Sequence, residues 1–314
     1  MLRTATFIFF FLVAFTTFAQ VKRVIEKSVL SEKALVTIRL DGYPDFLTAD
    51  GNDVWVTNIN KIQKLSINSS VPVLSVDIPG PCGAPVVAGA FIYVASCKTR
   101  SIYKINTRTA VIKKIIPSNI ADLSGEISLA YGAKSIWILS DSSGILSRIN
   151  PRTGNLIATI NVLPHSYCAV YGANSVWVSN SNARGSVQRI DPKTNSVVST
   201  IEVDAYPHFL VAGDKGVFTL NQQNGTVSHI DVLTNRVVAT ILAQVAGTGG
   251  DIDAARGKVW IRSKNGYPLL VIDALTDKII HTYLPLCGSG AVRIAGNYVW
   301  VTAHDIHTIW VLQE

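Results

Sequence analysis

The sequence predicts an all-β fold, a seven-bladed β-propeller of four-stranded antiparallel blades. The first observation is a repeated segment, of which residues 164–201 are the clearest copy. The second is an aromatic residue that recurs in the second strand of every copy. The third is a lone strand, residues 35–40, which precedes the first copy. Four short strands in about forty residues, repeated around a ring, are typical of propeller blades.

Residues 164–201 divide into four short strands separated by turn residues. The strands are expected at residues 167–171, 176–178, 185–190 and 197–201. Residues 185–190 alternate apolar and polar side chains, as a half-buried strand does. Asp191 and Pro192 then open a tight turn, because an Asx side chain accepts from backbone N–H groups ahead of it and Pro presets φ.

The second strands of all the copies share an aromatic side chain between apolar neighbours. These aromatics are Trp55, Tyr93, Trp137, Trp177, Phe218, Trp260 and Trp300. By subtraction they lie 38, 44, 40, 41, 42 and 40 residues apart. Seven copies at this spacing predict seven blades, with the aromatics packed as core between neighbouring sheets.

The two ends of the chain are expected to meet in one blade. The last copy runs out after its third strand, residues 308–312, and strand 35–40 can supply the fourth. This N-terminal strand would complete the last blade and hide its sheet edge. The propeller is therefore expected over residues 35–314, after a charged lead-in, residues 20–34, that has no clear periodicity.

Residues 1–19 have the pattern of a cleaved secretory signal. Arg3 is followed by an apolar run, residues 7–18, and by a small-residue cleavage site that ends at Ala19. The apolar run is too short to span a bilayer comfortably, and no second one follows. We therefore expect no membrane span and a mature protein outside the cytoplasm, either periplasmic or secreted.

The charge balance excludes few partners. The formal net charge is +7, and removing Arg3 with the signal leaves +6. Charged residues make up only 16% of the chain, so the surplus predicts solubility and weak attraction to anions. No basic run with interleaved aromatics is present, so a nucleic-acid partner is not expected. A closed ring of this kind is expected to be a monomer.

Four cysteines in an oxidising compartment favour pairing. Cys82 and Cys97 lie symmetrically about a turn at Gly89 and Ala90, which places them opposite each other in an antiparallel hairpin. We predict a disulfide between them. The other two, Cys168 and Cys287, belong to blades far apart and are expected to stay free.

The repeats resemble the YVTN-type β-propeller repeat family, most clearly over residues 174–195 and in the shorter copies at residues 53–58 and 224–231. The resemblance covers nearly all of residues 35–312 and implies the fold, while the superfamily includes both binding proteins and enzymes. In repeat pattern the chain is also similar to the streptogramin (virginiamycin B) lyase family. Those seven-bladed propellers use a divalent metal with His and Glu to open a cyclic depsipeptide by elimination.

The end of the second strand distinguishes each repeat of this chain from the lyase pattern. In that family the second strand characteristically ends in an aromatic residue, Phe, Thr and then Glu. No Glu occupies the corresponding positions here, which are Asn58, Ser96, Ser140, Asn180, Asn221, Ser263 and Ala303.

The start of each innermost strand and the loop after each second strand are expected on one face of the ring, where ligands usually bind. The strand starts contribute Asp45, Glu126, His165, His208, Asp251 and Asp253. Such imidazoles and carboxylates could hold a divalent cation or act as acid and base. The catalytic candidates are His165, His208 and Glu126, and the metal candidates are Asp45, Glu126, His208 and Asp251. The alternative is that these groups line a water-filled channel.

The loops after the second strands carry the other ligand candidates. They are Asn58, Arg100, Asn180, Arg184, Asn221, Arg262, Tyr267 and His304, to which the strand-start residues Asp45 and Asp251 are added. With nearby tyrosines such as Tyr206, this set would suit an anionic or sugar-like ligand through charge-assisted hydrogen bonds and stacking. The alternative is an ordinary solvated rim.

The function expected from these patterns is an exported binding or scaffold module for an unidentified small molecule or protein, with no cofactor. The alternative is a metal-assisted lyase or hydrolase that acts on a small cyclic or peptide-like molecule and needs a divalent metal.

Overall fold

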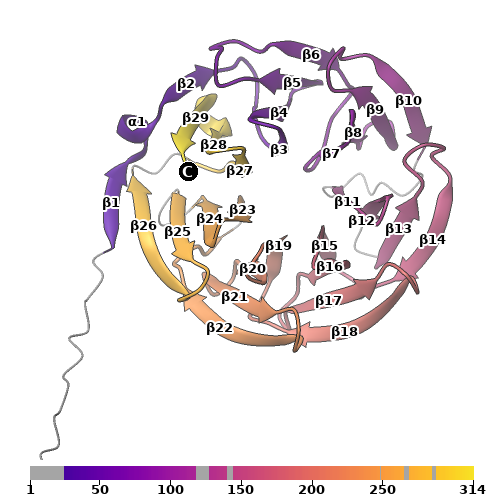
Figure 1. Cartoon of the computed structure of the whole chain (residues 1–314), viewed down its shortest axis with the longest axis vertical. Coiled ribbons are helices and arrows are strands. Elements are labelled where there is room, and N and C mark those ends of the chain that lie inside the picture. Colours follow the sequence, from indigo (N-terminus) through magenta and orange to yellow (C-terminus); the bar gives the residue numbers. More distant parts are fainter. Residues whose placement is uncertain (1–24, 118–126, 140–143, 248, 265–268, 285–287) are drawn as a thin grey trace, which may run out of the picture.

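The computed structural model describes residues 25–117, 127–139, 144–247, 249–264, 269–284 and 288–314. Within these residues the strands form seven sheets arranged around a central axis (Figure 1). Each sheet is a blade of four antiparallel strands, whose innermost member lies beside the axis, and one blade gains a fifth strand. The predicted seven-bladed propeller is therefore confirmed.

The strands follow the blades in chain order. Blade 1 has β3 (Leu47–Asp50), β4 (Asp53–Asn58), β5 (Lys61–Leu65) and β6 (Leu74–Asp77). Blade 2 has β7 (Val86–Ala88), β8 (Phe91–Ser96), β9 (Ser101–Asn106) and β10 (Ile112–Pro117). Blade 3 has β11 (Ser128–Gly132), β12 (Ser135–Leu139), β13 (Ile145–Ile149) and β14 (Leu156–Asn161). Blade 4 has β15 (Ser166–Gly172), β16 (Ser175–Asn180), β17 (Ser186–Asp191) and β18 (Ser196–Glu202).

The remaining blades include the two chain ends. Blade 5 has β19 (Pro207–Ala212), β20 (Val217–Asn221), β21 (Thr226–Asp231) and β22 (Arg236–Leu242). Blade 6 has β23 (Gly250–Ala255), β24 (Lys258–Ser263), β25 (Leu269–Asp273) and β26 (Lys278–Leu284). Blade 7 has β27 (Val292–Ala295), β28 (Tyr298–Ala303) and β29 (Thr308–Gln313), completed by β2 (Val36–Arg39).

The ring closes through its N-terminal strand, as the sequence predicts. β2 runs antiparallel to β29, with Thr37 opposite Trp310, and Ile38 is fully buried there. Part of the lead-in also forms regular structure. β1 (Glu26–Val29) lies parallel to β26 as a fifth strand of blade 6, and α1 (Leu30–Lys33) places Leu30 in the core between blades 6 and 7. A single buried leucine gives no periodic signal, so the pattern could not reveal this contact.

Neighbouring blades are joined by a repeated contact. A side chain of the third strand in one blade reaches the turn between the third and fourth strands of the next blade. In blade 4 the guanidinium of Arg189 lies 5.0 Å from the Trp177 ring and donates to Val232 O (2.7 Å) and Asn235 Oδ1 (2.8 Å) of blade 5. Arg148 makes the same contacts from blade 3 to blade 4. In blade 5 His229 takes this position, stacked on Phe218 and 2.8 Å from an Asp277 oxygen. The buried aromatics are thus core, as predicted.

The predicted disulfide between Cys82 and Cys97 is present, with Cα atoms 5.9 Å apart. Cys168 is a free cysteine, and Cys287 lies outside the described residues. No helix among the described residues is long and apolar enough to cross a membrane.

Candidate functional site

The upper face is the side of the ring where the innermost strands begin and the second strands end. The backbone pairing of Asp45 with Thr57 brings these two kinds of segment together in blade 1. Three features lie between this face and the axis: a central cavity, a pocket beside His208, and a cluster around His304.

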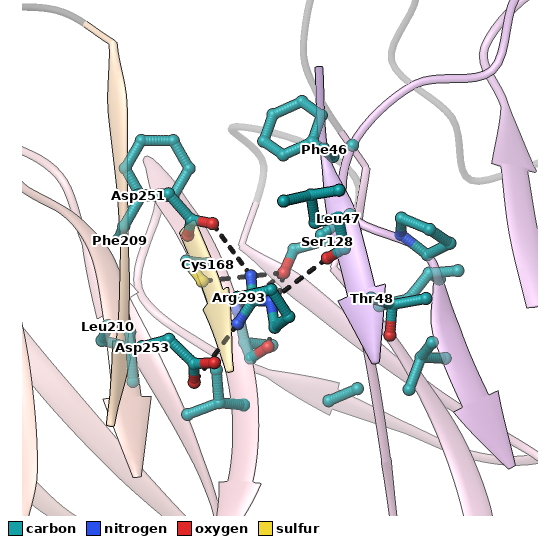
Figure 2. A pocket seen from close by; sticks show the side chains of 18 of the residues that line it. Phe46, Leu47, Thr48, Ser128, Cys168, Phe209, Leu210, Asp251, Asp253 and Arg293 are labelled. Atoms are coloured by element: carbon teal, nitrogen blue, oxygen red, sulfur yellow. Dashed lines mark hydrogen bonds and ion pairs between the residues drawn. The ribbon is translucent and has the colours of Figure 1, made fainter. Parts of the chain in front are cut away.

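The central cavity has a volume of about 380 Å³ and is lined by the innermost strands. Figure 2 shows Ser128, Cys168, Asp251, Asp253 and Arg293 among the residues of its wall. Cys168 Sγ lies 3.9 Å from Ser128 Oγ. Burial raises the pKa of the Cys168 thiol to about 11, so it is protonated at neutral pH. Among the described lining residues, the charged side chains are Asp251, Asp253 and Arg293, set in a wall of apolar, small and tyrosine side chains.

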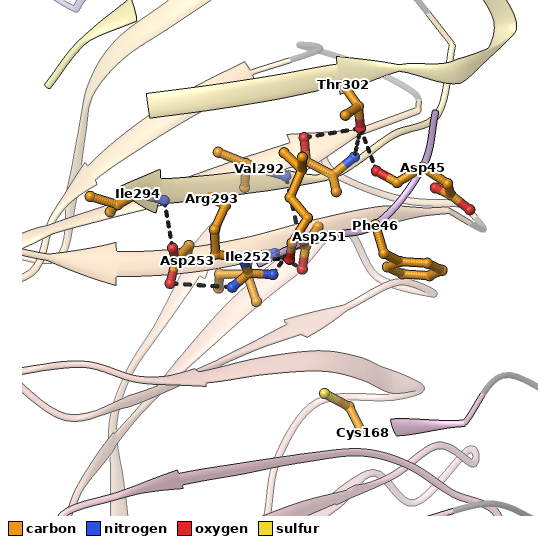
Figure 3. A network of polar contacts seen from close by, with 12 residues as sticks. Asp45, Phe46, Cys168, Asp251, Ile252, Asp253, Val292, Arg293, Ile294 and Thr302 are labelled. Carbon is orange, nitrogen blue, oxygen red and sulfur yellow. Dashed lines mark hydrogen bonds and ion pairs between the residues drawn. The ribbon is translucent and has the colours of Figure 1, made fainter. Parts of the chain in front are cut away.

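The charged cluster joins three blades (Figure 3). Arg293 of β27 places Nη2 2.9 Å from Asp251 Oδ2 and Nη1 3.4 Å from Asp253 Oδ1, both on β23. Its Nε donates to Leu47 O of β3 at 3.2 Å. Asp251 also accepts from the Ile252 and Val292 backbone N–H groups. The contacts tie blade 7 to blades 6 and 1 beside the axis.

Burial controls the electrostatics of this cluster. It raises the pKa of Asp251 to about 6, although Arg293 opposes the shift. Burial also acts to lower the pKa of Arg293. The carboxylates of Asp251 and Asp253 have the larger effect, so the pKa of Arg293 is raised above its ordinary value. The guanidinium is therefore charged at neutral pH, and the cluster is an internal ion-pair network.

Aromatic rings cover the upper mouth of the cavity. Phe46 of blade 1 and Phe209 of blade 5 have ring centroids 6.5 Å apart, and both side chains are buried. Tyr167 of blade 4 meets Phe209 edge-on at 5.4 Å and His208 edge-on at 4.5 Å. These four rings form an aromatic arc, defined as Phe46, Phe209, Tyr167 and His208, that runs from the axis toward blade 5.

The His208 pocket lies at the outer end of the arc. Its volume is about 450 Å³, and it is lined by Tyr206, His208, Gln222, Gln223 and Gly247. His208 Nδ1 lies 3.1 Å from Tyr206 O. A carbonyl oxygen only accepts, so Nδ1 carries the hydrogen and Nε2 is an acceptor. Burial lowers the pKa of His208, so the imidazole is neutral at pH 7.

The third feature is a cluster of ionisable groups between blades 7 and 1. His304 lies 3.6 Å from Asp45 Oδ1 and 3.3 Å from Asp305 Oδ1, and its ring is tilted by 39° against the Tyr43 ring, with centroids 4.1 Å apart. Burial lowers the pKa of His304, against the field of Asp305. A cavity of about 330 Å³ lined by Tyr43, Asp45 and Asn58 lies beside this cluster.

The structure separates the predicted strand-start residues. Asp251 belongs to the central cavity, His208 to its own pocket, and Asp45 to the His304 cluster. His165 is exposed in the loop before β15. Glu126 and Tyr267 lie outside the described residues. Among the described candidates, His208, Asp45 and Asp251 therefore do not share one pocket.

Several predicted ligand residues make contacts inside the protein instead. Asn58, Asn180 and Asn221 are buried at the ends of their second strands. Asn58, for example, accepts from Tyr43 N and donates to Asp41 O, which holds the entry loop of its blade. Arg262 is fully buried and donates to Thr302 O at 3.0 Å. Asn180 likewise donates to the loop carbonyl of Pro164, whereas Asn221 donates to the Thr226 and Ser228 hydroxyls and its Oδ1 has no partner. Arg100 and Arg184 are exposed.

The donor set of the described residues does not fit a divalent metal. No three His, Cys, Asp or Glu side chains among these residues are grouped to hold one. Asp251, the buried candidate, directs its oxygens at a guanidinium and at backbone N–H groups, which a cation would have to displace.

Residues missed in the sequence carry much of the site. Arg293, Gln222, Phe46 and Phe209 have no motif, because their roles depend on contacts between blades. The only usable signal was position, since Phe46 and Phe209 follow the predicted strand-start residues Asp45 and His208.

Comparison with known proteins identifies the architecture. No protein-family model matches the chain, and no curated protein matches it. Among solved structures, the chain is similar to virginiamycin B lyase from Staphylococcus aureus, with a TM-score of 0.71 and 13% identity. The match covers 89% of this chain and 98% of that one. At this identity the likeness shows the fold alone, and membership of the YVTN-type repeat family stays a prediction.

Proposed function

We propose that this chain is an exported binding module that holds a small molecule on its upper face, at the His208 pocket. The observation that carries the proposal is the aromatic arc, which fixes His208 by its edge contact with Tyr167 and leads to a pocket of about 450 Å³. Rings held in place beside amide side chains suit a ligand that has both an apolar face and hydrogen-bonding groups.

Two features support export. Residues 1–19 have the pattern of a secretory signal, and Cys82 and Cys97 form a disulfide, which persists in oxidising compartments. The described residues that line the pocket come from blade 5 and from the loops before and after it. We therefore expect a monomer to bind.

Native mass spectrometry of the mature protein, purified from the exporting compartment, tests this proposal together with a thermal-shift screen of small molecules. We expect a retained or stabilising compound whose binding is lost in His208→Ala and Tyr206→Ala. Tyr131→Ala is a matched control, because Tyr131 is 38% exposed and Tyr206 39%, and Tyr131 lies near the end of its innermost strand, away from the upper face. Binding that survives both pocket variants, or a screen with no binder, would refute the proposal.

A metal-assisted lyase or hydrolase acting on a small cyclic or peptide-like molecule is the second candidate. The likeness of the fold to virginiamycin B lyase favours it. Elemental analysis of the mature protein and of His208→Ala, with an assay for opening of a cyclic depsipeptide, tests it. A protein with neither stoichiometric metal nor turnover would remove this candidate and leave the binding module.

A further inference from the structure

We infer that the His208 pocket takes an uncharged, hydroxyl-bearing ligand of the saccharide type, and that Gln222 is the residue that recognises it. The inference rests on the proposed binding function and specifies the ligand class of the same pocket.

Gln222 presents an unused hydrogen-bond acceptor. It follows β20 directly, and only 4% of its surface is exposed. Its Nε2 donates to Gly249 O at 3.2 Å, which settles which end of the amide carries the hydrogens, because a carbonyl oxygen cannot donate. Its Oε1 is buried without a hydrogen-bond partner. Buried acceptors are almost always paired, so this oxygen calls for a donor from outside the chain.

His208 supplies a second acceptor in the same pocket. Its Nδ1 hydrogen is used by Tyr206 O, and Ser181 Oγ lies 3.3 Å from both ring nitrogens, which leaves Nε2 with one long, shared contact. A ligand with two hydroxyl groups can donate to Gln222 Oε1 and His208 Nε2 together. A peptide bond supplies only one N–H for the same pair of acceptors.

The other lining residues favour a neutral ligand. Among the described residues that line the pocket there is no Asp, Glu, Lys or Arg, so an ionic group would lose its hydration there without a counter-charge. The partly exposed Tyr206 ring offers a flat apolar surface for the C–H face of a sugar, and the exposed Gln223 side chain can both donate and accept. The volume of about 450 Å³ is within the range of small-molecule sites.

Isothermal titration of the mature protein tests the inference, with a panel of neutral mono- and disaccharides, sugar acids and short neutral peptides as probes. We expect neutral saccharides to bind and sugar acids to bind less. Gln222→Met keeps the length of the side chain but removes the acceptor, and should weaken binding about 10-fold, the effect of one hydrogen bond. Gln63→Met is the matched control, because Gln63 is also buried but pairs with Asn58 in blade 1. It should leave the affinity unchanged.

Deoxy analogues measured on the unmodified protein guard against a variant that fails to fold. One analogue should lose about the same 10-fold in affinity, and Gln222→Met should cause no further loss with that analogue. Saccharide binding that is unchanged in Gln222→Met and equal for every deoxy analogue would overturn the inference. Binding of peptides alone, lost in His208→Ala, would overturn it too but leave the proposed function standing. A panel and a wider screen that both lack a binder would overturn both.

Discussion

Arg293 Nη2 lies 2.9 Å from Asp251 Oδ2, across the boundary between the last blade and the one before it. The same guanidinium reaches Asp253 and the Leu47 carbonyl of blade 1. The ring is thus closed twice, by β2 at its outer edge and by this ion-pair network beside the axis (Figure 3).

Arg293→Met should destabilise the ring strongly. The change leaves Asp251 and Asp253 in the cavity wall without their cation, and removing one partner of a buried pair costs about 3–5 kcal/mol. The midpoint of urea unfolding measures the loss. Lys215→Met is the control, because Lys215 pairs with Asp214 while their side chains are 39% and 49% exposed, and such pairs contribute about 0–1 kcal/mol. Equal effects of the two changes would contradict an inner closure.

The free energy of unfolding should depend on pH through Asp251. Its pKa is raised to about 6 in the folded protein, while an Asp in the unfolded chain has a pKa near 3.8. The folded state therefore binds more protons between these values, and the stability from this group is lost as the pH rises from about 4 to 6. The loss is on the order of 3 kcal/mol, from a shift of about two pKa units. Urea unfolding of the unmodified protein and of Asp251→Asn at several pH values measures this loss. The stability of the unmodified protein relative to Asp251→Asn should fall as the pH rises from about 4 to 6. If it stays constant, the pKa of Asp251 is not raised.

Arg189→Met should loosen the contact between blades 4 and 5. The change removes the bonds to Val232 O and Asn235 Oδ1 and leaves those acceptors without their donor. We expect a loss of about 1–3 kcal/mol in the free energy of unfolding. Arg184→Met, an exposed site in the same blade, should change it by less than about 0.5 kcal/mol. If both substitutions change the free energy of unfolding equally, the contact of Arg189 with blade 5 contributes nothing to stability.

The two N-terminal strands should differ in importance. A chain that begins at residue 41 lacks β2 and the buried Ile38 and Leu40, so blade 7 loses its outer strand and the whole ring should unfold at a much lower temperature. A chain that begins at residue 34 loses β1 and the buried Leu30, whose burial contributes about 1.5–3 kcal/mol. Melting temperatures of the two truncations compare them. A truncation to residue 41 that melts like the full chain would disprove closure by β2.

Reduction of the Cys82–Cys97 disulfide should cost stability in blade 2. The bond closes a loop with a sequence separation of 15, for which the chain-entropy model gives about 3 kcal/mol. The double variant Cys82→Ser with Cys97→Ser should therefore unfold at lower urea concentration than the oxidised protein, whereas Cys168→Ser should not lose a cross-link. An oxidised protein no more stable than the double variant would show that the cross-link adds nothing.

The fold was predictable because a propeller repeats a local code. The recurring aromatics such as Trp55 and Trp177 mark each second strand, and each blade forms from residues close in sequence. Even closure was predictable, since one strand was missing at the end and one was spare at the start. The function of Asn58 was not predictable, because its position suggested the ligand face and only the entry loop, folded over it, shows which backbone groups it satisfies.

By itself the sequence determined the number of blades, their closure by the strand expected at residues 35–40 and the pairing of Cys82 with Cys97, because period, register and turn symmetry are local properties of a chain. Only the tertiary structure decided which polar residues meet. Asp251 and Arg293 lie 42 positions apart and come together through the packing of blade 6 on blade 7. The same packing parts His208 from Asp45 and leaves Gln222 Oε1 buried without a donor, since the neighbours of an inward-facing side chain are set by the adjoining blades and by no pattern along the strand.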